Sequence, residues 1–105
     1  MDVVEVAKAL ASPTRVAILG WLKHPEQHFV SRREGDLAPA GVCASLIAEK
    51  AGIAAPTASR HLDVLRRAGL IETQRITGWN YHRPRATGLA QAQQLLAQTL
   101  DPLAR

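Results

Sequence analysis

Residues 56–71 read PTASRHLDVLRRAGLI, and the pattern of this segment predicts a helix followed by a strand. The apolar residues of its first part recur at helical spacing: Ala58, Leu62 and Leu65. Pro56 suits the first turn of this helix, and Gly69 suits its end because glycine accepts the left-handed conformation. Residues 70–71 are strand formers. The segment therefore predicts an amphipathic helix that leads directly into a β-strand.

A second short helix is predicted just before this one. Its apolar spacing is carried by Cys43, Ile47 and Ala51. Gly52 ends it, and only residues 53–55 separate that glycine from Pro56. Two short helices joined by a few residues that include a glycine are typical of a helix-turn-helix.

A β-hairpin is predicted after the two helices. Residues 70–76 and 79–83 are rich in strand formers, and Thr77-Gly78 between them is a turn signal. Pro84 ends the second strand. Trp79 and Tyr81 share one face of that strand, and we expect both to pack the hairpin onto the helices.

Three further helices complete the reading, over residues 2–10, 12–23 and 86–100. Residues 25–41 have no sustained period and are read as a loop with a short extended piece at residues 28–30. The expected fold is mainly α with a small β-hairpin, a winged helix-turn-helix in the order α-α-α-α-β-β-α. Residues 1–105 are expected to form one DNA-binding domain with dimerisation helices at both ends.

Positive charge is concentrated in one quarter of the chain. The 105 residues carry a formal net charge of +4, and residues 60–85 contain six arginines against two acidic residues. Arginine forms forked hydrogen bonds to phosphates and base edges. This clustering favours a nucleic-acid partner, with a solvated basic face or an acidic protein partner as the alternatives.

The predicted contacts to double-stranded DNA fall into two groups. The first turns of the helix at 56–68 carry the recognition set: Pro56, Thr57, Ser59, Arg60 and His61. The hairpin, or wing, carries the second set: Arg75, Thr77, Gly78 and Arg83. Hydroxyls can bind a phosphate or a base edge, and arginine can hold a guanine with two hydrogen bonds. His61 and His82 are both interpreted as surface residues of this DNA face.

Apolar stripes at both ends of the chain predict a homodimer. The stripes comprise Val3, Val4, Ala7 and Leu10 at the start, and Leu89, Ala92, Leu96 and Leu100 at the end. Alternatively, these residues only cover the core of a monomer. A two-fold dimer would place two recognition helices about 34 Å apart, which predicts a near-palindromic operator.

The remaining composition excludes several classes of protein. Hydrophobic residues make up 47% and charged residues 21%, as in ordinary globular domains. No apolar run reaches the ~20 residues that a membrane helix needs, and the acidic start is unlike a secretory signal, so we expect a cytoplasmic protein with no membrane partner. No constellation of catalytic residues is recognisable, so neither an enzyme nor a cofactor is expected.

Two segments resemble the ArsR/SmtB-type transcriptional repressors. Residues 8–19, KALASPTRVAIL, are similar to the opening of that family, and residues 56–71 are similar to its recognition helix and the exit into the wing. The resemblance implies a homodimeric repressor that leaves its operator when an inducer binds. It also implies that Thr57, Ser59, Arg60 and His61 carry DNA recognition and that the first and last helices form the dimer.

The sequence departs from the metal-sensing members of that family. Their pair of thiolates is absent, since Cys43 is the only cysteine, and the last helix lacks histidine and glutamate. A metal site would need Cys43 with His24 and His28, or Cys43 from both chains across the dimer, and Pro25 opposes a helix that would join those histidines. No metal is therefore expected. Cys43 is interpreted as a buried core residue, with a thiol-responsive sensor as the alternative, and the inducer stays unknown.

Overall fold

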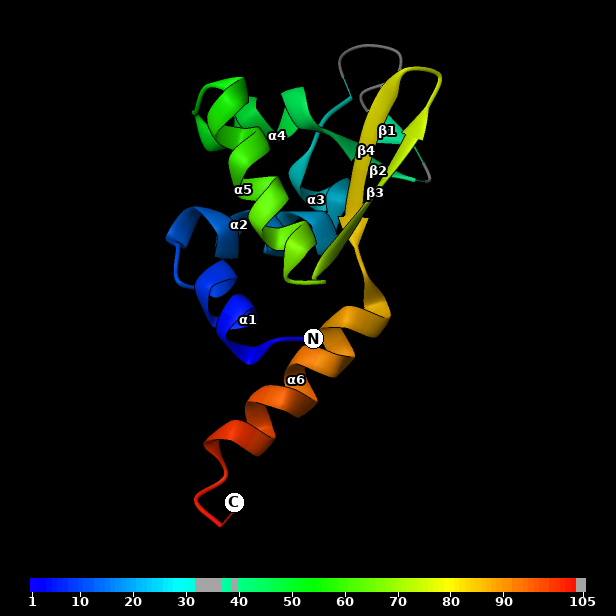
Figure 1. The fold of residues 1–105 in the computed structure, drawn as a ribbon. Helices are drawn as coiled ribbons and strands as arrows, with labels where there is room; N and C mark the ends of the chain where they lie inside the picture. The colour runs from blue at the N-terminus through cyan, green and yellow to red at the C-terminus, as the bar shows by residue number, and fades with distance from the viewer. Residues whose placement is uncertain (32–36, 39, 104–105) are drawn as a thin grey trace.

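Six helices and four strands make up the part of the chain that the computed structural model describes, residues 1–31, 37–38 and 40–103 (Figure 1). The helices are α1 (Val3–Leu10), α2 (Pro13–Lys23), α3 (Pro25–His28), α4 (Ala44–Ala51), α5 (Ala55–Arg67) and α6 (Ala86–Leu100). The strands are β1 (Leu37–Ala38), β2 (Gly41–Cys43), β3 (Ile71–Ile76) and β4 (Trp79–Pro84). The predicted mainly helical fold with a β-hairpin is confirmed, and α3, β1 and β2 are additions to the predicted order.

The first two helices begin as their sequences predict. The Asp2 carboxylate accepts a hydrogen bond from the Val4 N–H at 2.8 Å, and the Ser12 hydroxyl accepts one from the Arg15 N–H at 3.2 Å. Pro13 follows Ser12 in the first turn of α2, where its missing N–H removes no helical hydrogen bond. The helix predicted over residues 12–23 is confirmed, with Ser12 as its N-cap.

The helix-turn-helix consists of α4, a turn at residues 52–54, and α5. Gly52 adopts the left-handed conformation, with φ of 68°, and its N–H donates to the Glu49 carbonyl at 3.2 Å. Cys43 does not begin the first of these helices, contrary to prediction. It is the last residue of β2 and the N-cap of α4, and it pairs with Tyr81 of β4.

The sheet is antiparallel, with strand order β1-β2-β4-β3. The predicted hairpin is confirmed as β3 and β4, joined by Thr77 and Gly78, whose φ angles of 51° and 81° are those of a tight hairpin turn. Strands β1 and β2 extend the sheet on the other side of β4. Strand β4 is therefore paired on both sides, which the sequence did not predict.

The segment at residues 25–41 is not simply a loop. Pro25 occupies the first turn of α3 and therefore starts a helix rather than preventing one, with His24 as its N-cap. Of the extended piece predicted at residues 28–30, His28 instead ends α3, whereas Phe29 has an extended backbone, with φ of −126° and ψ of 138°. Within this segment, residues 32–36 and 39 lie outside the described part of the chain.

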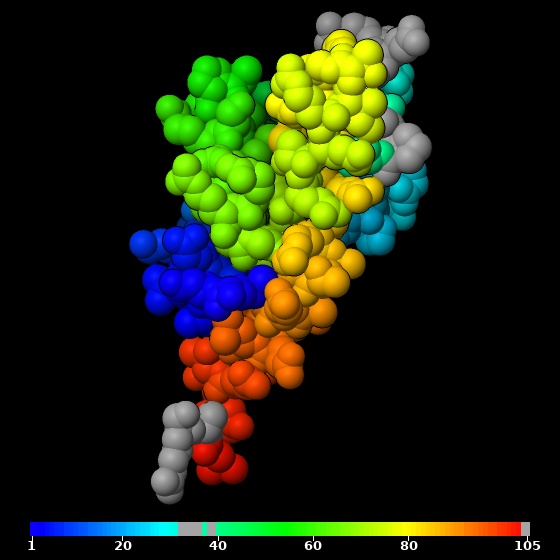
Figure 2. Space-filling view, turned by 45° about the vertical axis from the view of Figure 1, so that its right-hand side comes forward, coloured from blue at the N-terminus to red at the C-terminus, as the bar shows by residue number. Residues whose placement is uncertain are grey.

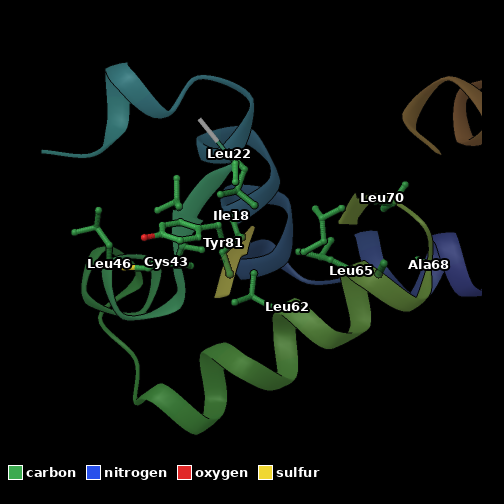
Figure 3. Packing of buried hydrophobic residues seen from close by; sticks show 14 of the residues in the cluster. Ile18, Leu22, Cys43, Leu46, Leu62, Leu65, Ala68, Leu70 and Tyr81 are labelled. Carbon is green, nitrogen blue, oxygen red and sulfur yellow. The ribbon is translucent and has the colours of Figure 1, made fainter. Parts of the chain in front are cut away.

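The core lies where α2, α4 and α5 meet the sheet (Figure 3). Ile18 and Leu22 of α2 face Leu62 of α5, and the Tyr81 ring lies among them. Tyr81 thus packs the hairpin onto the helices as predicted. Trp79 does not, because it is 43% exposed near the tip of the hairpin.

Helix α6 begins against the turn between α5 and β3 and then extends away from the other elements (Figures 1 and 2). At its start, Gly88 approaches the backbone of Gly69 so closely that a Cβ at residue 88 would lie 1.7 Å from the Gly69 carbonyl oxygen. The molecule is consequently elongated, measuring 51 × 24 × 24 Å. None of the helices in the described ranges is long and apolar enough to span a membrane.

Candidate nucleic-acid interface

Helix α5 is held to the core by one face and presents the other to solvent. Its buried face consists of Ala58, Leu62 and Leu65. In its first two turns, Pro56, Ser59 and Arg60 are exposed and Thr57 is half-buried. The Arg60 guanidinium donates a hydrogen bond to the Thr57 hydroxyl at 3.3 Å. Four of the five predicted recognition residues therefore lie at one exposed end of the helix.

The second half of α5 carries charges that pair with one another. Asp63 forms ion pairs with Arg66 and with Arg67, the latter at 2.9 Å. Exposed pairs of this kind contribute little to stability, but they partly neutralise the arginines involved. The positive charge that α5 offers to a partner is therefore concentrated at Arg60.

The register of the hairpin separates the two predicted wing arginines. Side chains of directly paired residues share a face of a sheet, and successive residues alternate between faces. Arg75 pairs with Asn80, whereas Arg83 pairs with Glu72, so the two arginines lie on opposite faces of the hairpin. Arg83 also forms an ion pair with the Glu72 carboxylate at 2.7 Å. The tip itself, Thr77-Gly78, is exposed.

A shallow groove of about 220 Å³ runs between α5 and the hairpin. Helices α4 and α5 contribute Ala44, Ser59, Leu62, Asp63 and Arg66 to its lining, and the hairpin contributes Thr73, Asn80 and His82. These three hairpin residues lie on the same face as Arg75. Asn80 pairs with Arg75, Thr73 lies two residues before Arg75 in β3, and His82 pairs with Thr73. The recognition helix and the wing thus meet along a polar groove, side by side in both overall views (Figures 1 and 2).

His82 is buried, contrary to its interpretation as a surface residue. It is 8% exposed, lies opposite Val42 of β2, and its Nδ1 is 2.9 Å from the Thr73 hydroxyl. Burial, together with the nearby positive charge of Arg66, lowers the pKa of His82 from 6.5 to about 4. The ring is therefore neutral at physiological pH, and His82 supports the groove from within.

His61 was interpreted as a surface residue, but its ring is half-buried and contacts α2. Its Nδ1 lies 3.1 Å from a guanidinium nitrogen of Arg15. Burial, Arg15 and Arg60 all lower the pKa of the His61 ring. Arg15 is not among the residues that the sequence predicts for this site. A signal was present: Ala9 lies four residues before Pro13, which has no N–H to donate to the Ala9 carbonyl.

Cys43 is buried, with 3% exposure, and its sulfur lies 3.3 Å from the Ser45 hydroxyl. This position agrees with its interpretation as a core residue. Across the residues that the structure describes, no three side chains of histidine, cysteine, aspartate or glutamate lie close enough together to hold a metal ion. The combination of Cys43 with His24 and His28 is thus not assembled in this fold.

The predicted dimer residues fall into two groups. Ala92 is buried within the single chain, and Leu10, Leu89 and Leu96 pack partly against its core. The remaining residues are more open: Val3 is half-buried, Ala7 is exposed, and Val4 and Leu100 are 56% and 77% exposed. Val16 on α2, at 50% exposure, belongs with this open group and was missed.

Comparisons with known proteins agree with this architecture. A helix-turn-helix domain family matches residues 34–74. The chain is 42% identical over 83 residues to an uncharacterized HTH-type transcriptional regulator, YbzH, of Bacillus subtilis (strain 168), covering 79% of this chain and 83% of the relative. The chain belongs to the ArsR-type family of winged helix-turn-helix transcriptional regulators. It is accordingly a DNA-binding transcriptional regulator.

Solved structures of other proteins share the fold. One is the solution structure of the homodimeric winged helix-turn-helix DNA-binding domain, fragment 1–100, of Mb0332 from Mycobacterium bovis, a possible ArsR-family transcriptional regulator. It is 28% identical, with a TM-score of 0.62, and covers 94% of this chain and 78% of that one. NolR from Sinorhizobium fredii is 21% identical, with a TM-score of 0.60 over 92% of this chain and 82% of its own.

Proposed function

We propose that this ArsR-type regulator acts as a homodimeric repressor that binds a near-palindromic operator. The recognition set comprises Pro56, Thr57, Ser59, Arg60 and His61, and the wing set comprises Arg75, Thr77 and Gly78. Arg83 joins the wing set only by exchanging the Glu72 carboxylate for a phosphate. The repressor leaves the operator when an inducer, whose identity is unknown, changes the spacing of the two halves.

The observation that carries this proposal is the exposed first half of α5 beside the polar groove. A helix held by Leu62 and Leu65 and open at Ser59 and Arg60 can enter a major groove with its N-terminal end. The backbone N–H groups at the start of the helix favour a phosphate there. Arg75, on the hairpin face that borders the groove, extends the positive surface toward an adjacent stretch of DNA backbone.

The dimer is supported by the apolar side chains that a single chain leaves open. Leu100 and Leu103 are 77% and 90% exposed, and they lie where the chain projects away from the other elements. Val4 and Val16 are 56% and 50% exposed. A second copy that covers these residues would remove them from water. The homodimeric state of the related Mb0332 domain supports the same arrangement.

The proposed mechanism needs no catalysis and no cofactor, and it places the protein in the cytoplasm with its DNA. Arginines first capture phosphates, and base contacts from α5 then select the sequence. A signal that alters the α6 contacts would change the separation of the two recognition helices and release the DNA. The alternative is a winged helix whose arginines bind an acidic protein.

Selection of bound fragments from a genomic library tests the proposal. A near-palindromic sequence should be enriched, and sedimentation should give the mass of two chains on one site. Recovery of unrelated fragments with no shared sequence would contradict operator binding and favour the protein-binding alternative. A preferred site occupied by a single chain would contradict the dimer.

A further inference from the structure

Arg15 joins three segments of the chain through one side chain. It lies on α2, and its guanidinium donates from Nε to the Ala9 carbonyl at 2.9 Å and from Nη2 to the Lys8 carbonyl at 2.7 Å. Its third nitrogen, Nη1, lies 3.1 Å from Nδ1 of His61 on α5. All three nitrogens of the guanidinium are therefore engaged, two with the end of α1 and one with the recognition helix.

The end of α1 requires such a donor. Carbonyls in the last turn of a helix have no partner within the helix. Because α1 ends at Leu10, the Ala9 carbonyl is one of these, and Pro13, four positions later, begins the next helix and has no N–H to offer it. Arg15 supplies the missing donor, and this anchors the guanidinium before it reaches His61.

The contact with His61 fixes the role of each ring nitrogen. A guanidinium has only donors, so Nδ1 of His61 must accept, and the proton of the neutral ring must reside on Nε2. The ring stays neutral because burial and the charges of Arg15 and Arg60 lower its pKa. Nε2 is therefore a hydrogen-bond donor on the residue that directly follows Arg60 in the recognition set.

We propose that Arg15 is a positioning residue for DNA recognition, which holds His61 as an Nε2–H donor to the operator and ties the recognition helix to the end of α1. This inference rests on the proposed function, because it concerns the same DNA-binding surface. The acceptor on DNA is a phosphate or base oxygen or a base nitrogen. Because α1 carries Val4 and Ala7 of the proposed dimer surface, the same side chain links that surface to the DNA contact.

The first test measures His61 in the free protein. NMR titration of the histidine rings should give a His61 pKa below 6.5 in the wild type, with the proton of the neutral ring on Nε2. In Arg15→Gln the pKa should rise toward 6.5, since one positive neighbour and one donor to Nδ1 are lost. A neutral ring protonated on Nδ1, or a pKa that Arg15→Gln leaves unchanged, would overturn the proposal.

The second test is a double-mutant cycle on binding to the selected DNA fragment. Arg15→Gln and His61→Ala should each weaken binding roughly three- to tenfold, as for the loss of one hydrogen bond, and the double variant should be no weaker than the weaker single variant. Lys23→Gln removes the same charge from an exposed position on the same helix and should retain wild-type affinity. Additive losses would mean that Arg15 acts only by stabilising α1, which contradicts the proposal.

If Arg15→Gln fails to fold, Arg15→Lys keeps the charge but lacks the planar fork, so it should show a smaller rise in His61 pKa, from the lost donor to Nδ1 alone, and the same non-additivity. Absence of any preferred DNA in the wild type overturns the proposed function together with this inference. Preferred binding that is indifferent to the Arg15 variants overturns this inference alone.

Discussion

Acidification should unfold this protein partly through His82, a buried ring at the centre of the sheet. His82 is 8% exposed, and its pKa is lowered to about 4 by burial and by Arg66. In the unfolded chain the ring regains its ordinary pKa of 6.5. The unfolded state therefore binds a proton more readily than the folded state, and protonation favours unfolding.

The pH range and the size of the effect follow from these two values. The stabilising contribution of the neutral ring is fully present above pH 6.5 and is lost as the pH falls toward 4. One unit of pKa is equivalent to about 1.4 kcal/mol, so the loss should be about 2 kcal/mol at pH 5 and about 3 kcal/mol at pH 4. A loss of that size is a large part of the stability of a small domain.

Guanidinium unfolding between pH 7 and pH 4 measures this loss. His82→Gln keeps a polar side chain opposite Thr73 but does not titrate, so the variant should lose about 2 kcal/mol less than the wild type between pH 7 and pH 5. His24→Gln, at an exposed position, is the control and should follow the wild type. If His82→Gln loses as much stability as the wild type, His82 is not the buried neutral ring described here.

Three further predictions concern packing, assembly and the single thiol. Gly88→Ala should destabilise the fold by about 1–3 kcal/mol, because the new methyl would meet the Gly69 carbonyl oxygen at 1.7 Å. The control Gly20→Ala meets nothing within 4 Å and should stabilise the fold by about 0.4–1 kcal/mol. Thermal melts that move both variants in the same direction would refute this prediction. Leu100→Glu should raise the dimer dissociation constant roughly tenfold or more, because Leu100 is 77% exposed in one chain; an unchanged mass distribution in sedimentation would place the dimer surface elsewhere. The Cys43 thiol should react with an alkylating reagent at least about 100-fold more slowly in the native than in the unfolded protein, since it is 3% exposed; rapid native labelling would reopen its interpretation as a sensor.

The helix-turn-helix and the hairpin could be predicted because their signals are local. Gly52 and Gly69 end helices at positions where only a left-handed residue fits, and Thr77-Gly78 closes a two-residue turn. Apolar spacing then assigns one face of α5 to the core. Each of these inferences depends on residues within a few positions of one another.

The short strands could not be predicted because long-range pairing alone defines them. Strand β2 has only three residues, and it is a strand because Val42 and Cys43 pair with β4. Cys43 also fits the helical spacing of Ile47 and Ala51, so the sequence alone does not distinguish a strand end from a helix start. This pairing also explains the error at His82, which would be near a sheet edge if β2 were a loop.

The sequence predicts that the DNA-binding surface is rich in arginine, but it does not predict how those arginines are arranged in space. Arg75 and Arg83 look equivalent in the sequence, but the hairpin register places them on opposite faces and pairs Arg83 with Glu72. His61 contacts Arg15 from 46 positions away, a distance over which no local pattern operates. The type of surface therefore follows from the sequence, whereas the side chains that compose it follow from the fold.

The central claim is that the exposed first half of α5 reads a DNA sequence. Its most direct test is the affinity of the wild type and Arg60→Ala for the selected fragment and for unrelated DNA at several salt concentrations. The wild type should prefer the selected fragment, with a log–log salt slope of about −0.9 per phosphate contact, and Arg60→Ala should cost about 1–3 kcal/mol on that fragment and relax the preference. Equal wild-type affinity for both DNAs, or a preference that Arg60→Ala leaves intact, would contradict the assignment of α5 as the recognition helix.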